Sequence, residues 1–430
     1  MKNLFLLRGL PGCGKSTWIK DNRLEPYTLS SDKLREMYGG LEYNLEGNLT
    51  ISSKRDKLVW ETLFNMLEAR MQRGLTTIID ATNIKEGTIN KYSKLANKYF
   101  YKVYVVDFTD VPVETCIERN KNRGYKKVPE KVIFSMADSL KTAKIPDGIK
   151  VISLYEFIDI IHAVDVEIFT ENYDRIMFIG DIHGCLNTLK EIFKEGVDEK
   201  TLYVFTGDYI DRGPYSVETV LWLSQFVNRK NFIFLEGNHE RWLRDWLTDN
   251  INDIRSKEFK EITSKQFDDY FSYEGNKRDK DFLQIVNFAS SLREFALIKI
   301  NSFSIKGKVA EMLGLNVQKE KYIFACHGGV PYINPTVGLM SSSDIIKGVG
   351  RYQDCVDVDN EFDKNLGNEL YQVHGHRNFY NSLIRVNYSV FNLEGNVERG
   401  GALRTVTFML NNGVLVDIET KEFKNKEDII

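Results

Sequence analysis

Four short apolar runs from residue 175 onward end in the same way, in polar side chains and glycine. They read RIMFIGDIHG, LYVFTGDYIDRG, FIFLEGNHE and YIFACHGG. Each run is rich in β-branched and aromatic residues, which is typical of buried strands. Open α/β sheets build their sites at the carboxyl ends of strands. The repeated pattern therefore predicts an α/β sheet whose strand ends share one site.

The histidines of the chain are concentrated in such blocks. Five of the six histidines are His183 in GDIHGC, His239 in GNHE, His327 in CHGG, and His374 and His376 in VHGHR. Neutral imidazole is the commonest metal-binding side chain, and the neighbouring Asp and Asn residues offer hard oxygen ligands. The set predicts a single metal centre.

A phosphate-binding loop stands near the start of the chain. The run GLPGCGKST follows the apolar segment NLFLLR and precedes a helical pattern, as the P-loop motif requires. Loop amides around Gly12 and Gly14 would cradle phosphates, and Lys15 would reach the terminal ones. Ser16, followed by Thr17, opens the helix, and the Ser16 hydroxyl can bind Mg²⁺. The motif predicts binding of a nucleotide such as ATP.

The remaining pattern predicts two α/β domains. Helical periodicity and β-rich runs alternate up to about residue 143, which favours a doubly wound parallel sheet of the P-loop kinase type. We expect this domain over residues 1–150, a linker over 151–173 and a second α/β domain over 174–430. The charged stretch over about 242–301 lacks a strand-end motif and is predicted to be a mainly helical insertion that caps the second site.

Charge and cysteine usage narrow the setting. Residues 1–150 carry 26 Lys and Arg against 18 Asp and Glu, although the whole chain has a net charge of -3. A polyanion partner and a merely solvated basic surface both explain this asymmetry. The 5 cysteines show no paired metal spacing and are expected to be reduced thiols in a cytoplasm. No apolar run approaches the roughly 18 residues of a membrane span, so no membrane partner is expected.

Several charged and polar residues surround the phosphate loop. From the residues alone, the carboxylate in SSDKLREMYGG could be only a helix N-cap, and the two arginines of CIERNKNRG could be a solvated face of one helix. The carboxylate that ends IIDATN fits a magnesium site better. In order, these residues are Asp32, Arg35, Asp80, Thr82, Asn83, Arg119 and Arg123.

In this order the elements resemble the polynucleotide 5′-kinases of phages and of bacterial RNA-repair enzymes, over about residues 1–150. The resemblance implies that Asp32 is the general base on a 5′-hydroxyl and that ATP with Mg²⁺ is the donor. Arg35 would grip the acceptor phosphate, with Thr82 and Asn83 in acceptor contacts. Arg119 and Arg123 would belong to a lid over the nucleotide phosphates, where guanidinium groups suit phosphoryl charge.

The motifs GDIHG, GDYIDRG, GNHE, HGG and a late GH resemble the calcineurin-like binuclear metallophosphoesterases, over about residues 175–410. That superfamily includes protein serine/threonine phosphatases and diadenosine tetraphosphate hydrolases, and the resemblance implies an α/β sandwich. It also implies site roles. Asp181 and His183 would bind a first metal, and Asp208 would bridge the two metals. Asn238, His327 and one histidine of VHGHR would bind the second metal. Arg212 would hold phosphoryl oxygens, and Asp211 would orient His239 as the acid.

Two positions in this second set stay open. The usual Gly-His pair selects His376 as the ligand, and His374 points to the other side of an extended segment. His374 is then a substrate-side or outer residue. Glu394, in VFNLEGNVERGG, stands where bacterial polynucleotide kinase–phosphatases carry Asp, so its substrate-steering role stays open as well.

Together the two resemblances imply a polynucleotide kinase–phosphatase that heals nucleic-acid ends. It would phosphorylate 5′-hydroxyl ends and remove 3′-phosphate or 2′,3′-cyclic phosphate ends with two divalent metals, manganese first and nickel, iron or zinc as further choices. Single-stranded broken RNA is the preferred partner, with DNA open. No lysine nucleophile motif is visible, so a separate ligase is expected.

Two other functions stay open from the sequence. The first is a small-molecule kinase fused to a dinucleoside-polyphosphate hydrolase. The second is a protein phosphatase under the control of a nucleotide-sensing P-loop domain. The sequence does not fix the oligomeric state.

Overall fold

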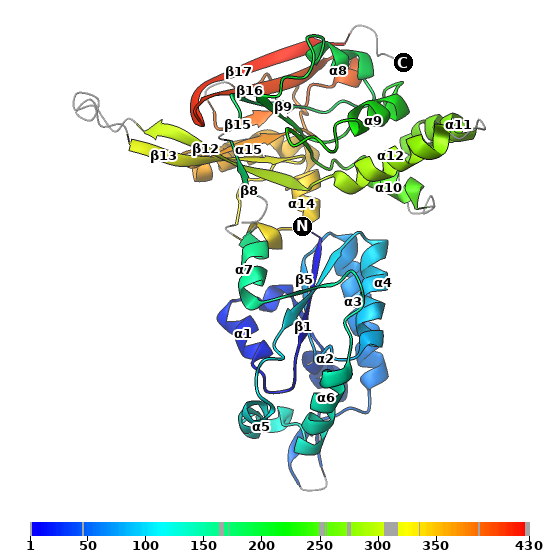
Figure 1. Cartoon of the computed structure of the whole chain (residues 1–430), viewed down its shortest axis with the longest axis vertical. Helices are drawn as coiled ribbons and strands as arrows, with labels where there is room; N and C mark the ends of the chain where they lie inside the picture. Colours follow the sequence, from blue (N-terminus) through cyan, green and yellow to red (C-terminus); the bar gives the residue numbers. More distant parts are fainter. Residues whose placement is uncertain are drawn as a thin grey trace. The chain divides into compact units, whose positions relative to one another are not determined.

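The computed structural model of the chain describes residues 2–44, 47–162, 167–170, 172–248, 254, 256–272, 277–304, 317–334, 336–385 and 388–425. The chain forms two compact units (Figure 1). Unit 1 comprises Met1–Asp165 with Asn334–Ser343, and unit 2 comprises Val166–Ile333 with Asp344–Ile430. Among the described helices, none combines the length and the apolar content needed to cross a bilayer.

Unit 1 is built on a five-stranded sheet in the described residues, with the order β2-β5-β1-β6-β7 and parallel pairing throughout. All six residues of its central strand are buried, as expected for a strand covered on both faces. Its elements are β1 (Asn3–Arg8), α1 (Lys15–Asp21), η1 (Glu25–Tyr27), β2 (Thr28–Ser30), α2 (Ser31–Gly39), β3 (Leu41–Tyr43), β4 (Leu49–Ile51), α3 (Asp56–Gln72), β5 (Thr77–Asp80), α4 (Glu86–Lys98), β6 (Lys102–Asp107), α5 (Val113–Lys121), η2 (Gly124–Lys126), α6 (Glu130–Thr142), β7 (Lys150–Ile152), α7 (Leu154–His162) and η6 (Val337–Leu339).

Helices cover both faces of this sheet. Phe5 and Leu7 of β1 pack against α1, α5, α6 and α7, whereas Leu4 and Leu6 pack against α2, α3 and α4. In Figure 1, α3 and α4 lie on one side of the sheet and α1 and α7 on the other. The alternation of β1 side chains between two helical layers confirms the predicted doubly wound α/β class.

Two further segments join unit 1. The stretch 151–173, expected to be a linker, begins within β7, which pairs with β6, and continues through α7, whose apolar residues recur at helical spacing; its later part holds β8, which pairs with β12 of unit 2. Phe157 of α7 is fully buried against the rings of Phe5 and Trp18, with centroids 4.6 and 4.9 Å away. The segment 334–343 also packs here, because Thr76 Oγ1 donates to the carbonyl of Gly338 at 2.9 Å.

Unit 2 contains a mixed sheet of ten strands in the described residues, with the order β11-β10-β9-β16-β17-β12-β13-β14-β15 and β8 beside β12. Its elements are β8 (Glu167–Phe169), β9 (Arg175–Ile179), α8 (Leu186–Ile192), β10 (Thr201–Phe205), α9 (Ser216–Ser224), β11 (Phe232–Phe234), α10 (Glu240–Leu247), the π-helix η5 (Phe259–Thr263), α11 (Ser264–Ser272), α12 (Lys277–Ser291), β12 (Phe295–Ser304), β13 (Val317–Cys326), η7 (Tyr352–Asp354), α15 (Cys355–Leu366), β14 (Leu370–His374), β15 (Val390–Asn392), η8 (Val397–Arg399), β16 (Ala402–Asn411) and β17 (Val414–Lys424); α14 (Ser342–Lys347) spans the unit boundary.

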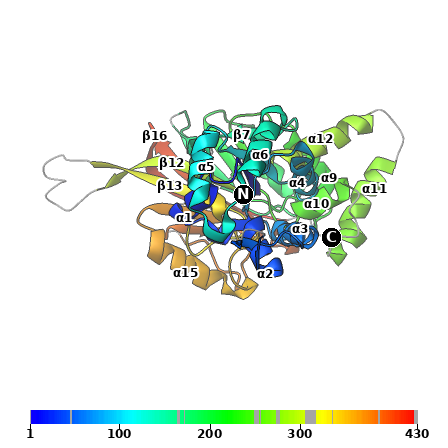
Figure 2. The ribbon, with the colours of Figure 1, turned by 90° about the horizontal axis from the view of Figure 1, so that it is seen from below.

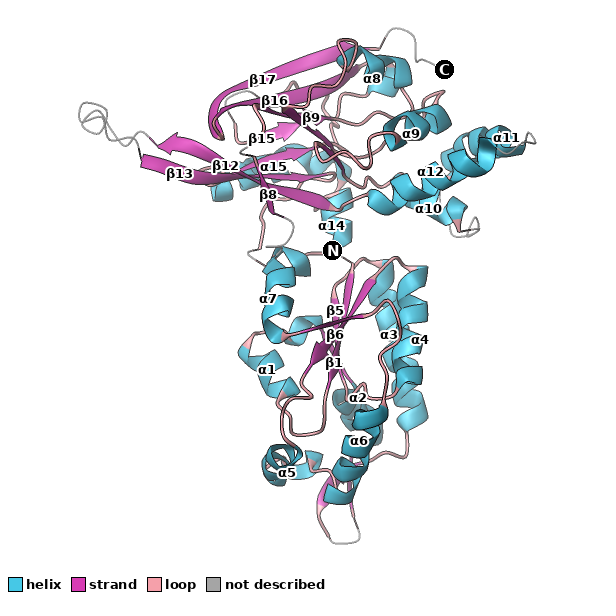
Figure 3. Ribbon diagram, in the orientation of Figure 1, coloured by secondary structure: helices cyan, strands magenta, loops and turns pink. Residues whose placement is uncertain are grey.

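The sheet of unit 2 folds into two facing layers. Phe178 of β9 and Phe408 of β16 share one apolar core with Ile298 of β12 and Ile323 of β13. Figure 3 shows the two sets of strands as separate layers, and Figure 2 shows the paired strands β12 and β13 extending from the others. This is the predicted α/β sandwich. Helices α8 to α12 cover the outer face of the β9-β10-β11 layer.

The expected insertion over about 242–301 is helical in part. The helices α10, α11 and α12 and the π-helix lie within residues 240–291, and β12 begins at Phe295. The run FALIKI alternates in side-chain direction, and its Ile298 and Ile300 are buried. That two-residue period explains why the end of the segment is a strand.

Replacement of Phe157 tests whether α7 belongs to the core of unit 1. The Phe157→Ala variant should lose about 3 to 5 kcal/mol of unfolding free energy, because a buried ring is removed from between two others. Native-state hydrogen exchange of the β1 and β6 amides measures this loss. Tyr155→Ala on the same helix is the matched control, since Tyr155 is 86% exposed. Equal protection in both variants would contradict the assignment.

Candidate functional site

The glycine loop joins β1 to α1 in the conformation that phosphate binding needs. Gly12 and Gly14 have φ angles of 89° and 105°, which side-chain-bearing residues rarely adopt. A Cβ on Gly12 would also overlap the backbone of Cys116. The Lys15 ammonium is buried and donates to the carbonyls of Gly9 and Leu10 at 2.8 and 2.9 Å. The glycine loop therefore surrounds the ammonium group of Lys15 with its own backbone carbonyls.

A hydroxyl–carboxylate pair lies beside this loop. Ser16 Oγ donates to Asp80 Oδ2 at 3.1 Å, and Ser30 Oγ donates to the same oxygen at 3.2 Å. Asp80 ends β5 and Ser16 opens α1, so two neighbouring strands bring the pair together. Thr17 follows on the exposed side of α1. Hydroxyl and carboxylate oxygens suit a Mg²⁺ ion that accompanies nucleotide phosphates.

Asp32 lies in the first turn of α2 between two arginines. Its Oδ1 accepts from Arg35 Nη1 at 2.9 Å, and its Oδ2 lies 3.6 Å from Arg123 Nη2. Arg35, predicted to grip the acceptor phosphate, also donates to Asp56 through Nε at 2.8 Å. In this structure Arg35 therefore fixes two carboxylates, and Asp32 keeps an exposed edge.

The two arginines predicted on one helix face are separated. Helix α5 ends at Lys121, and Arg123 precedes the turn η2. The chain turns because the Asn120 side chain bonds both the amide and the carbonyl of Val128, at 3.0 and 2.7 Å. Arg119 faces the glycine loop, since its Nη1 would lie 3.8 Å from a Cβ on Gly14. Arg123 faces Asp32 instead.

The residues after β5 hold the strand ends together. The carbonyl of Thr82 accepts from the amide of Gly9 at 3.1 Å. Asn83, predicted to contact the acceptor, is 3% exposed, and its Nδ2 donates to the carbonyls of Leu7 and Ile79 at 2.8 and 3.3 Å. The Asn83 amide is thus engaged with the backbone of β1 and β5.

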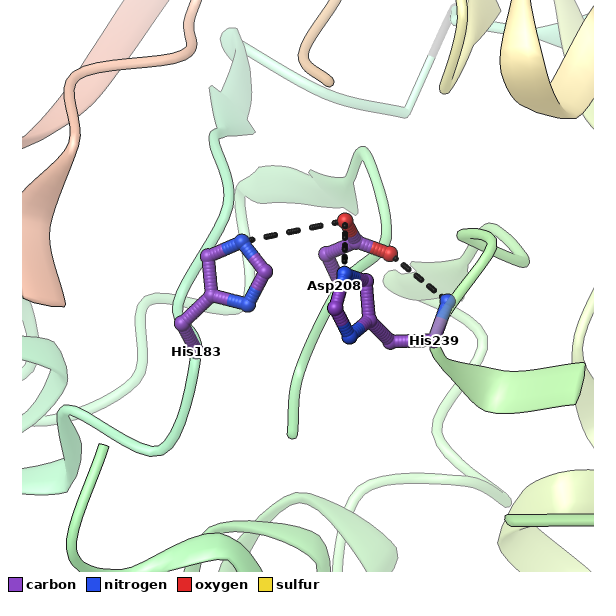
Figure 4. A group of neighbouring side chains, drawn as sticks. All are labelled: His183, Asp208 and His239. Atoms are coloured by element: carbon purple, nitrogen blue, oxygen red, sulfur yellow. Dashed lines mark hydrogen bonds and ion pairs between the residues drawn. The ribbon is translucent and has the colours of Figure 1, made fainter. Parts of the chain in front are cut away.

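The strand ends of unit 2 converge on a buried cluster. Its potential ligand atoms lie within 4.8 Å of one another in three overlapping groups of described residues: His183, Asp208 and His239; Asp208, His327 and His376; Asp181, His183 and Glu394. Figure 4 shows the rings of His183 and His239 both pointing at the Asp208 carboxylate, where each Nε2 faces Oδ2. Asp208 is shared by two groups and His183 by two, as in a centre for two neighbouring ions.

Hydrogen bonds orient the imidazoles for metal binding. His183 Nδ1 donates to the carbonyl of Ile210 at 3.1 Å and His327 Nδ1 to that of Thr206 at 3.0 Å. Their Nε2 atoms are left with a lone pair aimed at Asp208 Oδ2, at 3.7 and 3.1 Å. Asn238 Oδ1 lies 3.2 Å from His327 Nε2 and completes the second group. Such backbone partners fix the tautomer of metal-binding histidines.

The protonation tendencies of the cluster also fit divalent ions. Burial lowers the pKa of His183 and of His376 well below the ordinary value, so both imidazoles are neutral. Burial, with the Glu394 and Asp208 carboxylates, raises the pKa of Asp181 well above its usual range. Crowded buried carboxylates of this kind are compensated by bound cations. The donor set therefore fits two divalent metals.

The structure separates the two histidines of VHGHR. The amide of His376 donates to Asp181 Oδ2 at 2.8 Å, and its ring belongs to a ligand group. His374 Nε2 instead lies 3.0 Å from Asp359 Oδ1, and His374 is in none of the ligand groups found among the described residues. Gly375 stands between them because a Cβ there would overlap the Asp181 carboxylate. His376 is the better ligand and His374 an outer residue.

His239 forms a dyad with Asp211. The distance from His239 Nδ1 to Asp211 Oδ2 is 2.8 Å, and Nε2 faces the cluster, 3.6 Å from Asp208 Oδ2. Burial opposes a charged ring, but the Asp208 carboxylate and the Asp211 hydrogen bond outweigh it and raise the pKa of His239. Thr263 Oγ1 donates to the other oxygen of Asp211 and fixes its plane. This ring can deliver a proton into the site.

Arg212 is the cation of the site. Its Nη1 donates to Glu398 Oε1 at 3.1 Å and also lies 3.1 Å from His183 Nε2. Burial and the Glu394 carboxylate raise the pKa of Glu398. Glu398 was not predicted from the sequence, because 186 residues separate it from Arg212.

Glu240 is a second residue that the sequence analysis did not single out. It is fully buried and accepts from the amides of Gly237, Asp208 and Tyr209 at 2.8, 2.9 and 2.9 Å. Burial and the Asp208 carboxylate raise the pKa of Glu240 to about 7. The sequence offered one signal for this residue: Glu240 ends the motif GNHE, directly after the predicted site residues Asn238 and His239.

Several site residues have unusual backbone conformations. His183, Asp208, Asp211, Arg212 and His376 have positive φ angles between 46° and 77°. For residues with a Cβ this left-handed region costs roughly 1–2 kcal/mol each. Strain of this kind concentrates at functional sites, where the surrounding structure imposes it.

Comparisons with known proteins agree with the division of the chain into two units. The AAA domain profile matches residues 4–143, as a P-loop kinase-like domain, and the calcineurin-like phosphoesterase profile matches residues 174–415. Serine/threonine-protein phosphatase T of Aspergillus oryzae is 32% identical over 154 residues, 34% of this chain and 27% of that protein. Human serine/threonine-protein phosphatase 5 is 31% identical over 153 residues, 35% of this chain and 26% of that protein.

The match therefore spans about a quarter of the length of these curated relatives. Among solved structures, a protein serine/threonine phosphatase from Saccharomyces cerevisiae with similarity to human phosphatase PP5 has a TM-score of 0.39 and 17% identity. That alignment covers 70% of this chain and 97% of the yeast chain.

Metal content distinguishes the roles of His376 and His374. The His376→Ala variant should bind Mn²⁺ at least about 10-fold more weakly, because a ligand is lost. His374→Ala should keep its metal and lose about 1–3 kcal/mol of stability, since Asp359 loses its partner. Elemental analysis after dialysis and Mn²⁺ titration measure both, with His162→Ala as the control. Equal metal loss in the two site variants would contradict the assignment.

Proposed function

The chain belongs to the calcineurin-like phosphoesterase family, and from this premise we propose that it is a two-site enzyme that heals nucleic-acid ends. Its P-loop unit phosphorylates 5′-hydroxyl ends with ATP and Mg²⁺. Its phosphoesterase unit removes 3′-phosphate or 2′,3′-cyclic phosphate ends with two divalent metals, manganese first. Broken single-stranded RNA is the preferred substrate, and a separate ligase then seals the ends.

The observation that carries the proposal is the position of Asp32. This carboxylate lies between Arg35 and Arg123, in the unit that also holds the phosphate loop. A hydroxyl acceptor needs a base to take its proton, and the arginines suit the phosphate that follows a 5′-hydroxyl in a polynucleotide. Asp32 would take the proton as the 5′ oxygen bonds to the transferred phosphorus. Lys15 and Arg119 would hold the donor phosphates.

The residues of unit 2 supply a complementary hydrolysis. Arg212 would bind two phosphoryl oxygens, while Asp211 holds His239 with its Nε2 toward the leaving oxygen. As water attacks phosphorus and the bond to the 3′ oxygen breaks, His239 gives its proton to that oxygen. Divalent ions held by the clustered ligands supply Lewis-acid chemistry to the phosphate and to the water. The products are a 3′-hydroxyl end and inorganic phosphate.

A second candidate function follows from the curated relatives, which are named serine/threonine phosphatases. In this alternative, unit 2 dephosphorylates proteins and the P-loop unit senses a nucleotide. This alternative assigns no function to Asp32 and the two arginines beside it. Phosphorylation of an oligonucleotide separates the two functions directly.

Reciprocal substitutions test the two-site enzyme. Asp32→Asn should lower transfer of labelled phosphate from ATP to a 5′-hydroxyl oligonucleotide by about 10²–10⁴-fold, since the base is lost. It should leave 3′-end removal intact, and His183→Ala should show the reverse. Asp138→Asn, at an exposed site on α6, is the control. RNA and DNA oligonucleotides are assayed in parallel.

Absence of label transfer by the folded wild-type protein would overturn the kinase half of the proposal. Loss of both activities in either single variant would contradict the independence of the two sites.

The role of His239 is visible in its dependence on the leaving group. His239→Asn should slow release of phosphate from a 3′-phosphorylated oligonucleotide by about 10²–10⁴-fold, because the departing alkoxide needs a proton. Hydrolysis of p-nitrophenyl phosphate should fall much less, since its leaving group is stable as an anion. Asp211→Asn should give the same pattern with a smaller effect. A uniform fall on both substrates would argue against proton donation.

A further inference from the structure

Three exposed aromatic side chains stand beside the metal centre. Tyr352 is 44% exposed, Phe379 57% and Tyr380 60%. Tyr352 begins the turn η7, and the other two follow the ligand His376 by three and four residues. Large rings that are open to water at one place are unfavourable in a soluble fold unless a partner covers them.

The rings form a continuous path that starts at a predicted metal ligand. The Tyr352 and His376 ring centroids are 5.9 Å apart, those of Tyr352 and Phe379 6.4 Å, and those of Phe379 and Tyr380 5.1 Å. Each pair meets edge to face, with interplanar angles of 75°, 77° and 87°. In an edge-to-face pair only one of the two rings has a face covered by the other, so exposed faces remain on which flat groups can pack.

The inner end of this path opens on the site itself. The Tyr352 ring meets the ring of the predicted ligand His376 edge to face, so this end of the path lies at the ligand cluster. The outer end carries hydrogen-bonding groups, since Asn396 Nδ2 donates to Asn381 Oδ1 at 2.8 Å. Arg399 in the turn η8, which follows Asn396, has a side chain that is 72% exposed, lies 3.5 Å from Glu398 and adds a positive charge.

We propose that Tyr352, Phe379 and Tyr380 form a stacking platform for the nucleobases next to the terminal phosphate of a single-stranded nucleic acid. This inference rests on the proposed function and adds how the substrate is held. Aromatic platforms bind single strands because every base has a π-face, whereas the phosphate alone carries no base information. The platform places the terminal base outside the site while its 3′-phosphate reaches the metals.

Nucleobases suit this surface better than a phosphoprotein does. A peptide that carries a phosphoserine has one short side chain at the phosphate and no row of flat groups behind it. A single-stranded nucleic acid has a flat group on every residue, at a regular distance from each phosphate. The three rings lead away from His376 in series, so successive bases would each meet an aromatic side chain.

A terminal abasic nucleotide tests the platform in the full-length protein loaded with Mn²⁺. Two oligoribonucleotides are compared, both with a 3′-phosphate, one with a normal terminal base and one without it. Stacking contributes about 1–3 kcal/mol per base, so kcat/KM of the wild type should be about 5- to 150-fold higher with the base. Phe379→Ala with Tyr380→Ala should remove most of this preference, and Phe379→Trp should keep it.

The control variant is Val416→Ala on β17, which is exposed and outside the site. Glycerol 2-phosphate, which has no ring, reports the intact chemistry, and its hydrolysis should change little in the double variant. An equal fall on glycerol 2-phosphate and on the oligonucleotide would overturn the platform, because it indicates damage to the centre.

Two further outcomes separate this inference from the proposed function. If the wild type removes both 3′-phosphates equally well, the proposed function stands and the platform is wrong. If it hydrolyses glycerol 2-phosphate and phosphopeptides but no 3′-phosphorylated oligonucleotide, the proposed function fails and the platform fails with it.

Discussion

The carboxylate of Glu240 holds together the two loops on which the metal centre depends. It receives the amides of Gly237, Asp208 and Tyr209, and so joins the end of β11 to the end of β10. Glu240 is fully buried, so these hydrogen bonds are shielded from water. A side chain at position 237 would overlap Asp208. The left-handed conformation of Asp208 is thus imposed by its neighbours. Its carboxylate is therefore held in a fixed position relative to the surrounding histidines.

The second constraint on the metal centre of unit 2 is the balance between its buried negative and positive charges. The buried carboxylate of Asp181 lies close to that of Glu394 and interacts with that of Asp208, and uncompensated charges in such surroundings are costly. Arg212 offsets part of the negative charge, as His239 does when it is protonated, and divalent cations would offset the remainder. The Asp211 and Glu398 carboxylates orient His239 and Arg212, respectively, and bind no metal in this arrangement. The site therefore uses its acids in two ways, as ligands and as orienting groups.

Local sequence patterns predicted what depends on neighbours in the chain. The glycine loop and the strand ends follow from a few consecutive residues with a clear period, whereas the metal-binding roles of His183 and Asp208 came from the resemblance of their motifs to a known family. Contacts over long separations gave no such signal. Glu398 and Arg212 are in contact although 186 residues separate them in the sequence. The hydrogen bonds between Asn120 and Val128, which end α5 before Arg123, depend on a turn of the chain. The choice between His374 and His376 needed the positions of Asp359 and Asp181, which come from other elements.

The segment 334–343 has a consequence for how the chain is made. Its Leu339 enters the core of unit 1, and the amide of Ser342 donates to the carbonyl of Gly74 at 3.0 Å. During synthesis from the amino terminus, the ribosome must add all of Val166–Ile333, the first part of unit 2, before unit 1 receives this last piece. The two units consequently cannot mature strictly one after the other. A gene fusion or a cut at residue 165 would also deprive unit 1 of a piece that lies far downstream in the message.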